Sequence, residues 1–505
     1  DAIFFEGKAE KPVYLLITDG EAELKDAGHL WGKNTAETDE QIKADNNDKT
    51  IRVACIGPAG EKLSRLACII NDWGRAAARS GLGAVMGSKN LKAVACKGSF
   101  KPNIFNPEKV KEFMSQVAEA IKTKPPPPFL ELSRYGTCGS VVRHGFEHET
   151  PIKNWSGNNI EDFPIEKFER IDGDSVKKYI TAKYVCHGCP IGCGGWLKVE
   201  SGRYALEKAH KPEYESIAAF GPMCLNDDIE SIIYANHLCN MYGLDTISAG
   251  ATIAFAMECF EKGILTQRDT EGITLDWGNT EAIIEVLKKI CEREGIGDVL
   301  ADGVKMAAAR IGRGAEKFAI HVCGQELPYH DPRNMPGWGI AYVCDPTPGR
   351  HTRGVNTAPI IKEERNLLGK GKIHAVGIAR NHILSTSGLC FFGAFLRIPL
   401  REVLEAVTGW NLNDEELVRT GHRIAVIMHA FNLREGLKPS DFTMPSRAAG
   451  DPPLKVGKLK DVTLDFETPK KEYYEAMGLN TETGRISTER IKELELDEIS
   501  DLFMD

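Results

Sequence analysis

The sequence predicts an α+β protein in which a β-rich N-terminal part precedes a largely helical body. Three observations carry this prediction. Short apolar runs bounded by turn residues recur in residues 1–100, and helical spacing of apolar residues dominates the remainder. The length of 505 residues also exceeds what one ordinary core accommodates. We expect a remainder of a β-rich domain at 1–108 and two mostly helical domains at 109–319 and 320–505.

Strands are predicted at 2–5, 13–17, 22–24, 51–56 and 91–96 from their short apolar runs. Asp19-Gly20 is typical of a hairpin turn and joins the second run to the third. Because the chain opens inside a predicted strand and lacks an initiator Met, we expect the sequence to begin partway into a domain.

Helices are predicted at 227–239, 247–260, 281–294 and 413–432. In the third of these, the apolar residues share one helical face: Ile283, Ile284, Leu287, Ile290 and Cys291. Asn279 or Thr280 is expected to cap its start and Gly295 to end it. The helix at 247–260 is apolar nearly all round, which predicts complete burial.

Composition excludes several classes of protein. Hydrophobic residues make up 42% and charged residues 27%, as in folded globular proteins, so the chain is not disordered. The 63 basic and 72 acidic residues give a net charge of −9, which argues against nucleic acid or an anionic membrane as the main partner. No apolar run reaches the roughly 18 residues of a membrane span.

Most of the 14 cysteines stand alone in apolar runs, which indicates a reducing compartment and predicts a cytoplasmic protein. Cys186, Cys189 and Cys193 are the exception. Their C-x2-C-x3-C spacing suits three ligands of a cubane iron–sulfur cluster; a zinc site that recruits a fourth ligand, or no metal, are the alternatives. Cys390 is a candidate fourth ligand, although a cysteine in an apolar run more often serves packing.

Two glycine- and proline-rich regions are further candidates. In 74–90, Arg79 and Lys89 can neutralise a phosphate beside glycines, but a glycine turn that packs a helix on a sheet is equally consistent with the pattern. The second region, 326–333 with 348–353, predicts an ordered irregular segment, either functional or a surface Ω-loop.

The segment 211–216 carries two carboxylates, Glu213 and Glu215. Pro212 suits the first turn of a helix, where the two side chains diverge, so we expect only one of them to enter a given cavity. An exposed glutamate is the alternative interpretation of each.

Taken together, these blocks resemble the aldehyde ferredoxin oxidoreductase family of tungsten–pterin enzymes. The resemblance begins at 2–14 and continues through 56–60, 83–93, the cysteine triplet, 212–216, 243–248, 331–333 and 387–390 to the C-terminal tail. It implies that this sequence lacks the front of the N-terminal pterin-binding domain.

The resemblance also implies a set of site residues. One [4Fe–4S] cluster would be bound by Cys186, Cys189, Cys193 and Cys390. A tungsten or molybdenum bis-molybdopterin, with Mg²⁺ bridging its phosphates, would be bound by Arg79, Gly81, Gly83, Asn240, Gly243, Leu244, Asp245, Asp331, Arg333, Arg353, Ser385, Gly388 and Leu389. Glu215 would act as general base and His351, titrating near neutrality, as hydrogen-bond donor.

The implied reaction is oxidation of an aldehyde to a carboxylic acid with water as oxygen source, with electrons leaving through the cluster to ferredoxin or an iron–sulfur partner subunit. Two alternatives stay open. The same fold could reduce an acid or an activated ring within a larger complex, or the chain could be an electron carrier without pterin.

Departures from the family pattern affect these expectations. Asn240 and Ser385 replace the Asp that opens each pterin turn, which suggests the carrier alternative. Tyr234 and Ile284 replace the Glu and His of an interfacial metal site, so any oligomer is expected to form without a bridging metal. Arg353 replaces a Lys near the cavity, and His330 and Cys344 are expected to border it, which leaves the substrate open.

Overall fold

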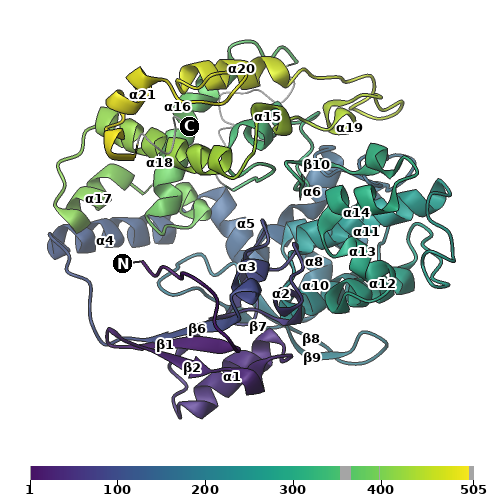
Figure 1. Ribbon diagram of the computed structural model, residues 1–505, viewed down its shortest axis with the longest axis horizontal. Helices are drawn as coiled ribbons and strands as arrows, with labels where there is room; N and C mark the ends of the chain where they lie inside the picture. Colours follow the sequence, from purple (N-terminus) through teal and green to yellow (C-terminus); the bar gives the residue numbers. More distant parts are fainter. Residues whose placement is uncertain (1, 353–364, 397, 500–505) are drawn as a thin grey trace.

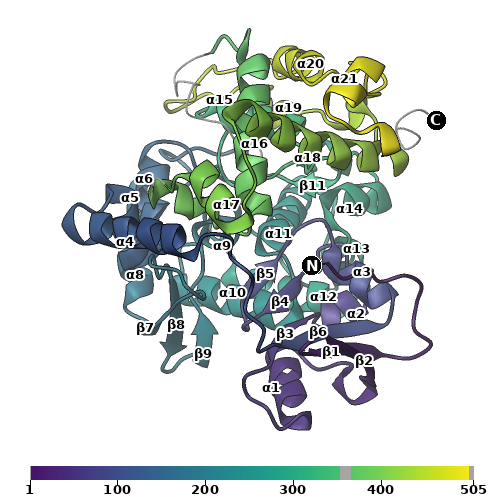
Figure 2. The same ribbon diagram turned by 90° about the vertical axis from the view of Figure 1, so that its left-hand side faces the viewer.

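The computed structural model describes residues 2–352, 365–396 and 398–499, and it confirms the α+β class. A β-rich N-terminal part lies against a helical body, and the C-terminal helices α15–α21 form the opposite end of the molecule (Figures 1 and 2). In the described part of the chain, no helix has the length and apolar character to cross a membrane.

The N-terminal part is built on one six-stranded sheet of order β2-β1-β6-β3-β4-β5. Its strands are β1 (Val13–Thr18), β2 (Glu21–Asp26), β3 (Arg52–Cys55), β4 (Ile69–Asn71), β5 (Arg75–Ala77) and β6 (Leu91–Lys97). β1 and β6 pair in parallel, whereas the other neighbours are antiparallel. Three helices accompany the sheet: α1 (Thr35–Asp45), α2 (Pro58–Glu61) and α3 (Leu82–Ser88).

The predicted strands are confirmed with one exception. Residues 2–5 form no strand, and Ile3 and Phe4 are exposed. Without a neighbouring strand to pair with, an apolar run cannot join a sheet whatever its propensity. Prediction also missed β4 and β5, because a strand of three residues is too short to show an alternating pattern.

The middle of the chain is mostly helical. It contains α4 (Pro107–Thr123), α5 (Pro127–Tyr135), α6 (Val141–Phe146), α7 (Ile165–Arg170), α8 (Gly173–Lys177), α9 (Tyr214–Phe220), α10 (Ile229–Tyr242), α11 (Thr246–Glu261), α12 (Thr280–Glu292), α13 (Ile296–Leu300) and α14 (Gly303–Ile311). A three-stranded sheet of β7 (Ile180–Tyr184), β8 (Gly194–Val199) and β9 (Leu206–His210) interrupts the helices.

The C-terminal part begins with a short β10–β11 hairpin (His321–Val322 and Gln325–Glu326). The helices that follow are α15 (Pro336–Cys344), α16 (Lys370–Thr386), α17 (Leu400–Thr408), α18 (Asp414–Arg434), α19 (Ser446–Ala449), α20 (Glu467–Ala476) and α21 (Thr488–Glu493).

All four predicted helices are present, as α10, α11, α12 and α18. Helix α11 is buried at every position from Ile247 to Cys259, as its apolar sequence predicts. The Asn279 side chain accepts the Ala282 N–H and caps α12, but Gly295 does not end this helix. The helix ends at Arg293, which takes the left-handed conformation (φ 51°) and bonds Asp298 through its guanidinium.

A single apolar core runs through the helical body and includes residues from both sides of the predicted boundary at 319/320. A second, smaller core lies under the N-terminal sheet and includes Tyr14, Leu30 and Ile42. Helices α9 and α11 are buried within the large core, so side chains at their N-terminal ends are held on rigid elements.

Candidate active site

Two cavities adjoin at the junction of the N-terminal sheet and the helical body. The first, of about 790 Å³, is lined by the 74–82 segment, the N-terminal ends of α9 and α11, and the 347–352 loop. The second, of about 1070 Å³, extends toward α14 and α18. Arg79, Ser80, Asp245 and Thr347 line both cavities and form their common wall.

Arg79 is held within this wall by protein groups. Its guanidinium donates to the carbonyls of Gly349 (2.7 Å) and Glu326, and its Nε lies 3.3 Å from Asp245 Oδ2. Asp245 in turn accepts the Ile247 N–H at the start of α11. Because Asp245 compensates its charge, Arg79 shapes the wall and is not a free cation.

Glu215 enters the first cavity from the first turn of α9. Its Oε2 accepts the backbone N–H of Tyr329 (3.0 Å), whereas its Oε1 lies 3.3 Å from His330 Nε2 and 3.6 Å from His351 Nε2. Burial raises the pKa of Glu215 above its ordinary value, and His330 and the Tyr329 N–H oppose this shift. The carboxyl group therefore holds a proton more readily than an exposed glutamate.

Glu213, the N-cap of α9, diverges from Glu215 as predicted. It accepts a hydrogen bond from Thr137 Oγ1 and lies 3.9 Å from Lys211 Nζ and 3.7 Å from Arg75. The expectation that only one of the two carboxylates enters a given cavity is wrong, because both line the first one. The cavity spans both sides of the α9 N-terminus and reaches each side chain separately.

His351 does not titrate near neutrality as expected. Burial lowers its pKa well below the ordinary value, and the positive charges of His330, Arg79 and Arg350 lower it further. His351 is therefore a neutral imidazole at pH 7, which still offers one N–H as a hydrogen-bond donor.

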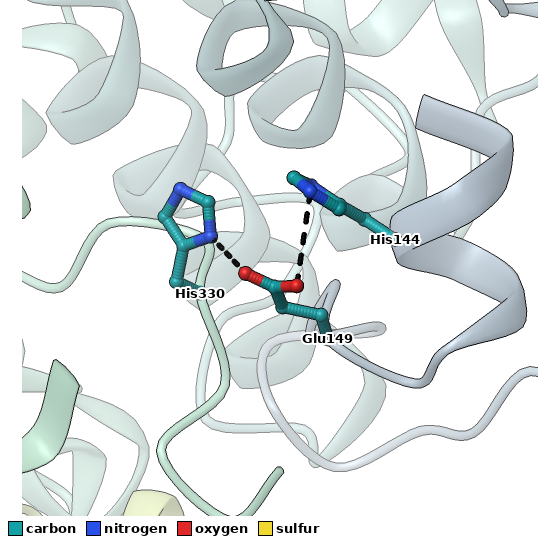
Figure 3. Close-up of side chains that lie close together, drawn as sticks. All are labelled: His144, Glu149 and His330. Atoms are coloured by element: carbon teal, nitrogen blue, oxygen red, sulfur yellow. Dashed lines mark hydrogen bonds and ion pairs between the residues drawn. The ribbon is translucent and has the colours of Figure 1, made fainter. Parts of the chain in front are cut away.

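Behind Glu215 lies a buried group of three side chains, His330, Glu149 and His144 (Figure 3). His330 Nδ1 and Glu149 Oε1 are 2.5 Å apart, and His144 Nε2 lies 3.7 Å from Glu149 Oε2. Burial lowers the pKa of His330, but Glu149 and Glu215 outweigh it and the net shift is upward. Sequence reasoning placed His330 beside the cavity but missed Glu149 and His144, which no spacing pattern marks.

The predicted pterin turn at 240–246 contributes to both cavities. Asn240, Leu244 and Asp245 line the first, and Asp245 also lines the second. Gly243 ends α10 with φ 73° and lines neither; a Cβ there would lie 3.0 Å from Gly57 N. Its glycine is therefore explained by backbone packing between the two parts of the chain.

Of the two predicted glycines that follow Arg79, one lines a cavity and the other packs against backbone. Gly81 (φ 68°) precedes α3 and lines the second cavity. Gly83 lines neither cavity, and a Cβ there would meet the Cys68 carbonyl at 2.5 Å. Packing of α3 against the 67–68 backbone accounts for Gly83, as the turn interpretation of this segment expects, whereas the anion-site interpretation stays a prediction.

Several other predicted residues lie away from both cavities. Asp331 and Arg333 form a buried ion pair at 2.6 Å with each other. Ser385, Gly388 and Leu389 lie at the end of α16 and in the turn before Cys390. Cys344 is buried in α15 and lines neither cavity. Arg353 lies outside the described residues.

The cysteine triplet occupies the turn between β7 and β8, and Cys390 approaches it from the end of α16. Burial raises the pKa of Cys390, and the neighbouring thiols of Cys189 and Cys186 raise it further. Cys189 and Cys193 pack in one apolar cluster with Phe392, from the turn that follows Cys390. The structure thus brings together four cysteines separated by about 200 residues in sequence.

Arg75 and Lys211 lie between the first cavity and the cysteine turn, and sequence reasoning assigned a role to neither. Both line the cavity, and both contribute to the electrostatic environment of Cys193. Arg75 also stacks on Tyr184, at the end of β7. The only signal in the sequence is that Arg75 lies in the segment 74–90, considered for Arg79, and Lys211 in the segment 211–216, considered for Glu215.

Several buried polar atoms of the first cavity have no hydrogen-bond partner among the described residues, including Arg75 Nε and Nη2, Arg79 Nε, Glu215 Oε1 and His351 Nδ1. Buried polar groups are normally paired, so their convergence on one cavity indicates a polar ligand. A large cofactor with anionic and hydrogen-bonding groups fits this donor and acceptor set.

Comparison with known proteins identifies the family. The family models for aldehyde ferredoxin oxidoreductase match its N-terminal domain at residues 1–98 and its domains 2 and 3 at residues 112–496.

Two curated relatives are named tungsten-containing aldehyde ferredoxin oxidoreductase, from Pyrococcus furiosus and Thermococcus kodakarensis. Each is 36% identical over 98% of this chain and 81% of its own length. The WOR-like subunit of an aliphatic sulfonate oxidoreductase from P. furiosus is 31% identical over 99% of this chain and 80% of its own length.

Among solved structures, the active site complex of benzoyl coenzyme A reductase with 1,5-dienoyl-CoA matches with a TM-score of 0.80 and 25% identity. The match covers 99% of this chain and 82% of that one. The chain is an oxidoreductase that belongs to the aldehyde ferredoxin oxidoreductase family, in which the relatives from P. furiosus and T. kodakarensis that it matches at 36% identity are named tungsten-containing.

Proposed function

We propose that the protein oxidises aldehydes to carboxylic acids at a tungsten bis-pterin centre and passes the electrons through one [4Fe–4S] cluster to ferredoxin or an iron–sulfur partner subunit. One observation carries this proposal. In a chain of this family, Glu215 and His351 converge in a buried cavity, where Glu215 Oε1 and His351 Nδ1 have no hydrogen-bond partner among the described residues. We also propose that the chain divides into three domains, at 1–108, 109–319 and 320–505, as the sequence predicts.

Both cavities would hold the pterin cofactor, one on each side of the wall formed by Arg79 and Asp245. On the first side, Asn240 and the cations Arg75 and Lys211 would bind its polar and anionic groups. On the second, the backbone at Gly81 and the cation Lys305 would do so. Molybdenum in place of tungsten, and Mg²⁺ between phosphates, would use the same residues.

When bound, the cofactor supplies the two-electron redox chemistry at the substrate's carbonyl carbon, and the cluster carries the electrons outward. The chain's own residues bind, orient and handle protons. Neutral His351 donates an N–H to the substrate's carbonyl oxygen, which polarises the carbonyl. Glu215 Oε1 accepts the proton that water releases as its oxygen becomes bonded to carbon.

The cluster would be held by the cysteines of the β7–β8 turn together with Cys390. Four thiolates complete the ligand set of a cubane cluster. Without iron, burial raises the pKa of Cys193 to about 11, so in the free protein this ligand is a thiol and binding the cluster releases its proton.

A second candidate function is a low-potential reduction within a larger complex. The observation that favours it is the similarity to the active site complex of benzoyl coenzyme A reductase. In this alternative, the same Glu215 would deliver a proton to the substrate. Its raised pKa serves that role as well, because the protonated acid is then accessible closer to neutrality.

The two reactions are separated by assaying one preparation in both directions. Protein purified without oxygen would be analysed for tungsten, molybdenum, iron and released pterin. It would then be offered aldehydes with an oxidised dye, and acids or aromatic thioesters with a strong reductant. Aldehyde-dependent dye reduction supports the proposal. Turnover only in the reducing direction supports the alternative. Iron without tungsten, molybdenum or pterin contradicts both and indicates an electron carrier.

A further inference from the structure

We propose that the buried ammonium group of Lys211 raises the reduction potential of the iron–sulfur cluster and so helps the cluster to take electrons from the cavity side. The inference rests on the proposed binding of a cubane cluster by the cysteines of the β7–β8 turn and Cys390. Lys211 touches no reacting atom in it; this lysine is a positioning residue whose charge acts through the cluster.

The backbone anchors Lys211 beside the cysteine turn. Lys211 directly follows β9, and its N–H donates to the Gly195 carbonyl (2.8 Å) in β8, the strand that begins after Cys193. The side chain of Lys211 is only 2% exposed. A buried side chain that starts from paired strands has a fixed position relative to the turn.

Gly136 shows how close the ammonium group comes to Cys193. Gly136 ends α5 with φ 72°, and a Cβ at this position would overlap both Lys211 Nζ and the Cys193 carbonyl oxygen. These two atoms therefore face each other across a space no larger than a methyl group. Glycine at position 136 permits both the left-handed backbone and the approach of the lysine to the turn.

Neighbouring groups compensate the charge of Lys211 only in part. Cys138 Sγ, at 3.7 Å, is the only hydrogen-bond partner of Nζ among the described residues, and burial raises the pKa of Cys138, which stays a neutral thiol. Glu213 Oε2 lies 3.9 Å from Nζ, but Glu213 Oε1 also lies 3.7 Å from Arg75. One carboxylate thus faces two cations, which leaves a net positive charge between the cavity and the turn.

Lys211 remains charged in spite of its burial. Burial favours the neutral amine, but Glu213 and the neighbouring cysteines outweigh it, and the pKa of Lys211 is raised above its ordinary value. A buried ammonium without a hydrogen-bonded counter-ion is costly unless it stabilises a negative charge. An anionic cluster on Cys193 and its partners would supply that charge.

The direction of the effect follows from electrostatics. Four thiolates make a cubane cluster anionic, and reduction adds one more negative charge. A nearby cation attracts the reduced form more strongly than the oxidised form, so it raises the reduction potential. The electron comes from the cofactor in the cavity and leaves to ferredoxin or the iron–sulfur partner subunit. Lys211 keeps its proton throughout and is neither oxidised nor reduced.

The test measures the midpoint potential of the cluster in holoprotein purified without oxygen, from the EPR signal of the reduced cluster during a redox titration. Lys211→Met keeps a long side chain but removes its charge. The ratio of reduced to oxidised cluster at a fixed potential should fall about tenfold, which lowers the midpoint by about 59 mV for one electron. Lys211→Arg keeps the charge and should restore most of the unaltered value.

Two further variants separate an effect of charge from an effect of packing. Glu213→Gln removes the carboxylate that partly compensates Lys211, so the midpoint should move the opposite way, to higher potential. This variant also serves if Lys211→Met does not fold. Lys470→Met is the matched control, because Lys470 is a comparably buried lysine in α20, at the opposite end of the molecule from β7 and β8 (Figures 1 and 2). It should leave the midpoint unchanged.

An unchanged midpoint in Lys211→Met would overturn the inference, and loss of tungsten or molybdenum from that variant would then assign the lysine to the cofactor alone. Equal shifts in Lys211→Met and Lys211→Arg would also overturn it, because charge would not be the cause. Failure of the proposed function looks different. The unaltered protein would then oxidise no aldehyde while Lys211→Met still lowers the midpoint, or it would contain no cubane cluster, which overturns both.

Discussion

The cavity around Glu215 and the cysteine turn of 186–193 differ in burial. Glu215, His330 and Glu149 are buried and held by one another, whereas Cys186 and Cys390 are exposed, and burial and the neighbouring thiols raise the pKa of Cys390. Proton chemistry benefits from a site that excludes water and amplifies electrostatic interactions. A redox group that exchanges electrons with a partner protein must instead lie close to the surface.

The two regions differ in whether the protein alone arranges their side chains. The carboxylates and imidazoles are aligned by the protein alone, through backbone donors such as the Tyr329 N–H. The cysteine turn is completed only by what it binds, because burial keeps Cys193 a thiol until a metal replaces its proton. Lys211 and Glu213, at the N-terminal end of α9, form an ion pair that lies between the two regions.

The largest expected effect separates the two regions outright. Glu215→Gln removes the proton acceptor without changing its volume, and we expect turnover to fall by about 10²–10⁴-fold. Tungsten and iron contents should equal those of the unaltered protein, measured by elemental analysis. Loss of iron together with activity would show that the two regions are not independent.

Cys390→Ser tests the other region. We expect most of the iron and the cluster's visible absorbance to be lost, because a cubane cluster requires four strong ligands. Cys344→Ser, which alters a buried cysteine in α15, is the control and should retain both. A full cluster in Cys390→Ser would place the fourth ligand elsewhere.

Glu213→Gln tests the connection between the regions. The structure gives Glu213 contacts to Lys211, Arg75 and Thr137. Burial favours protonation of Glu213, yet Lys211 and its neighbours hold its pKa below the ordinary value.

We expect about 2 kcal/mol of lost stability on chemical denaturation, less than for a fully buried pair because Glu213 is partly exposed. We also expect a shifted cluster potential in voltammetry, since Lys211 near Cys193 loses its counter-charge. If Glu213→Gln keeps the stability and the cluster potential of the unaltered protein, the contact between Glu213 and Lys211 contributes to neither.

The pH dependence of stability gives the smallest effect. The pKa of Glu149 falls from 4.5 to about 2 on folding, so its stabilisation is present above pH 4.5 and is lost as pH falls toward 2. The pKa of His330 rises above 6.5 on folding, so its contribution is present below pH 6.5 and is lost at higher pH. Denaturation of the unaltered protein and Glu149→Gln should therefore differ most between pH 4.5 and 6.5.

Local patterns predicted four helices and four strands correctly, because those patterns are short-range. The apolar spacing of 281–294 and the all-apolar segment at 247–260 define helices through neighbours three and four residues apart. The strand predicted at residues 2–5 is absent, because a strand needs a partner strand that no local pattern specifies.

The sequence by itself determined the fold class, the family and the residue types of the site, since Glu215, His351 and the cysteines stand in motifs readable one segment at a time. Only the tertiary structure decided that Glu149 and His330, which are 181 residues apart, form a hydrogen bond, and that Arg79 is neutralised by Asp245. The pKa of a buried group depends on charges within a few ångströms, and those neighbours are set by packing of distant segments.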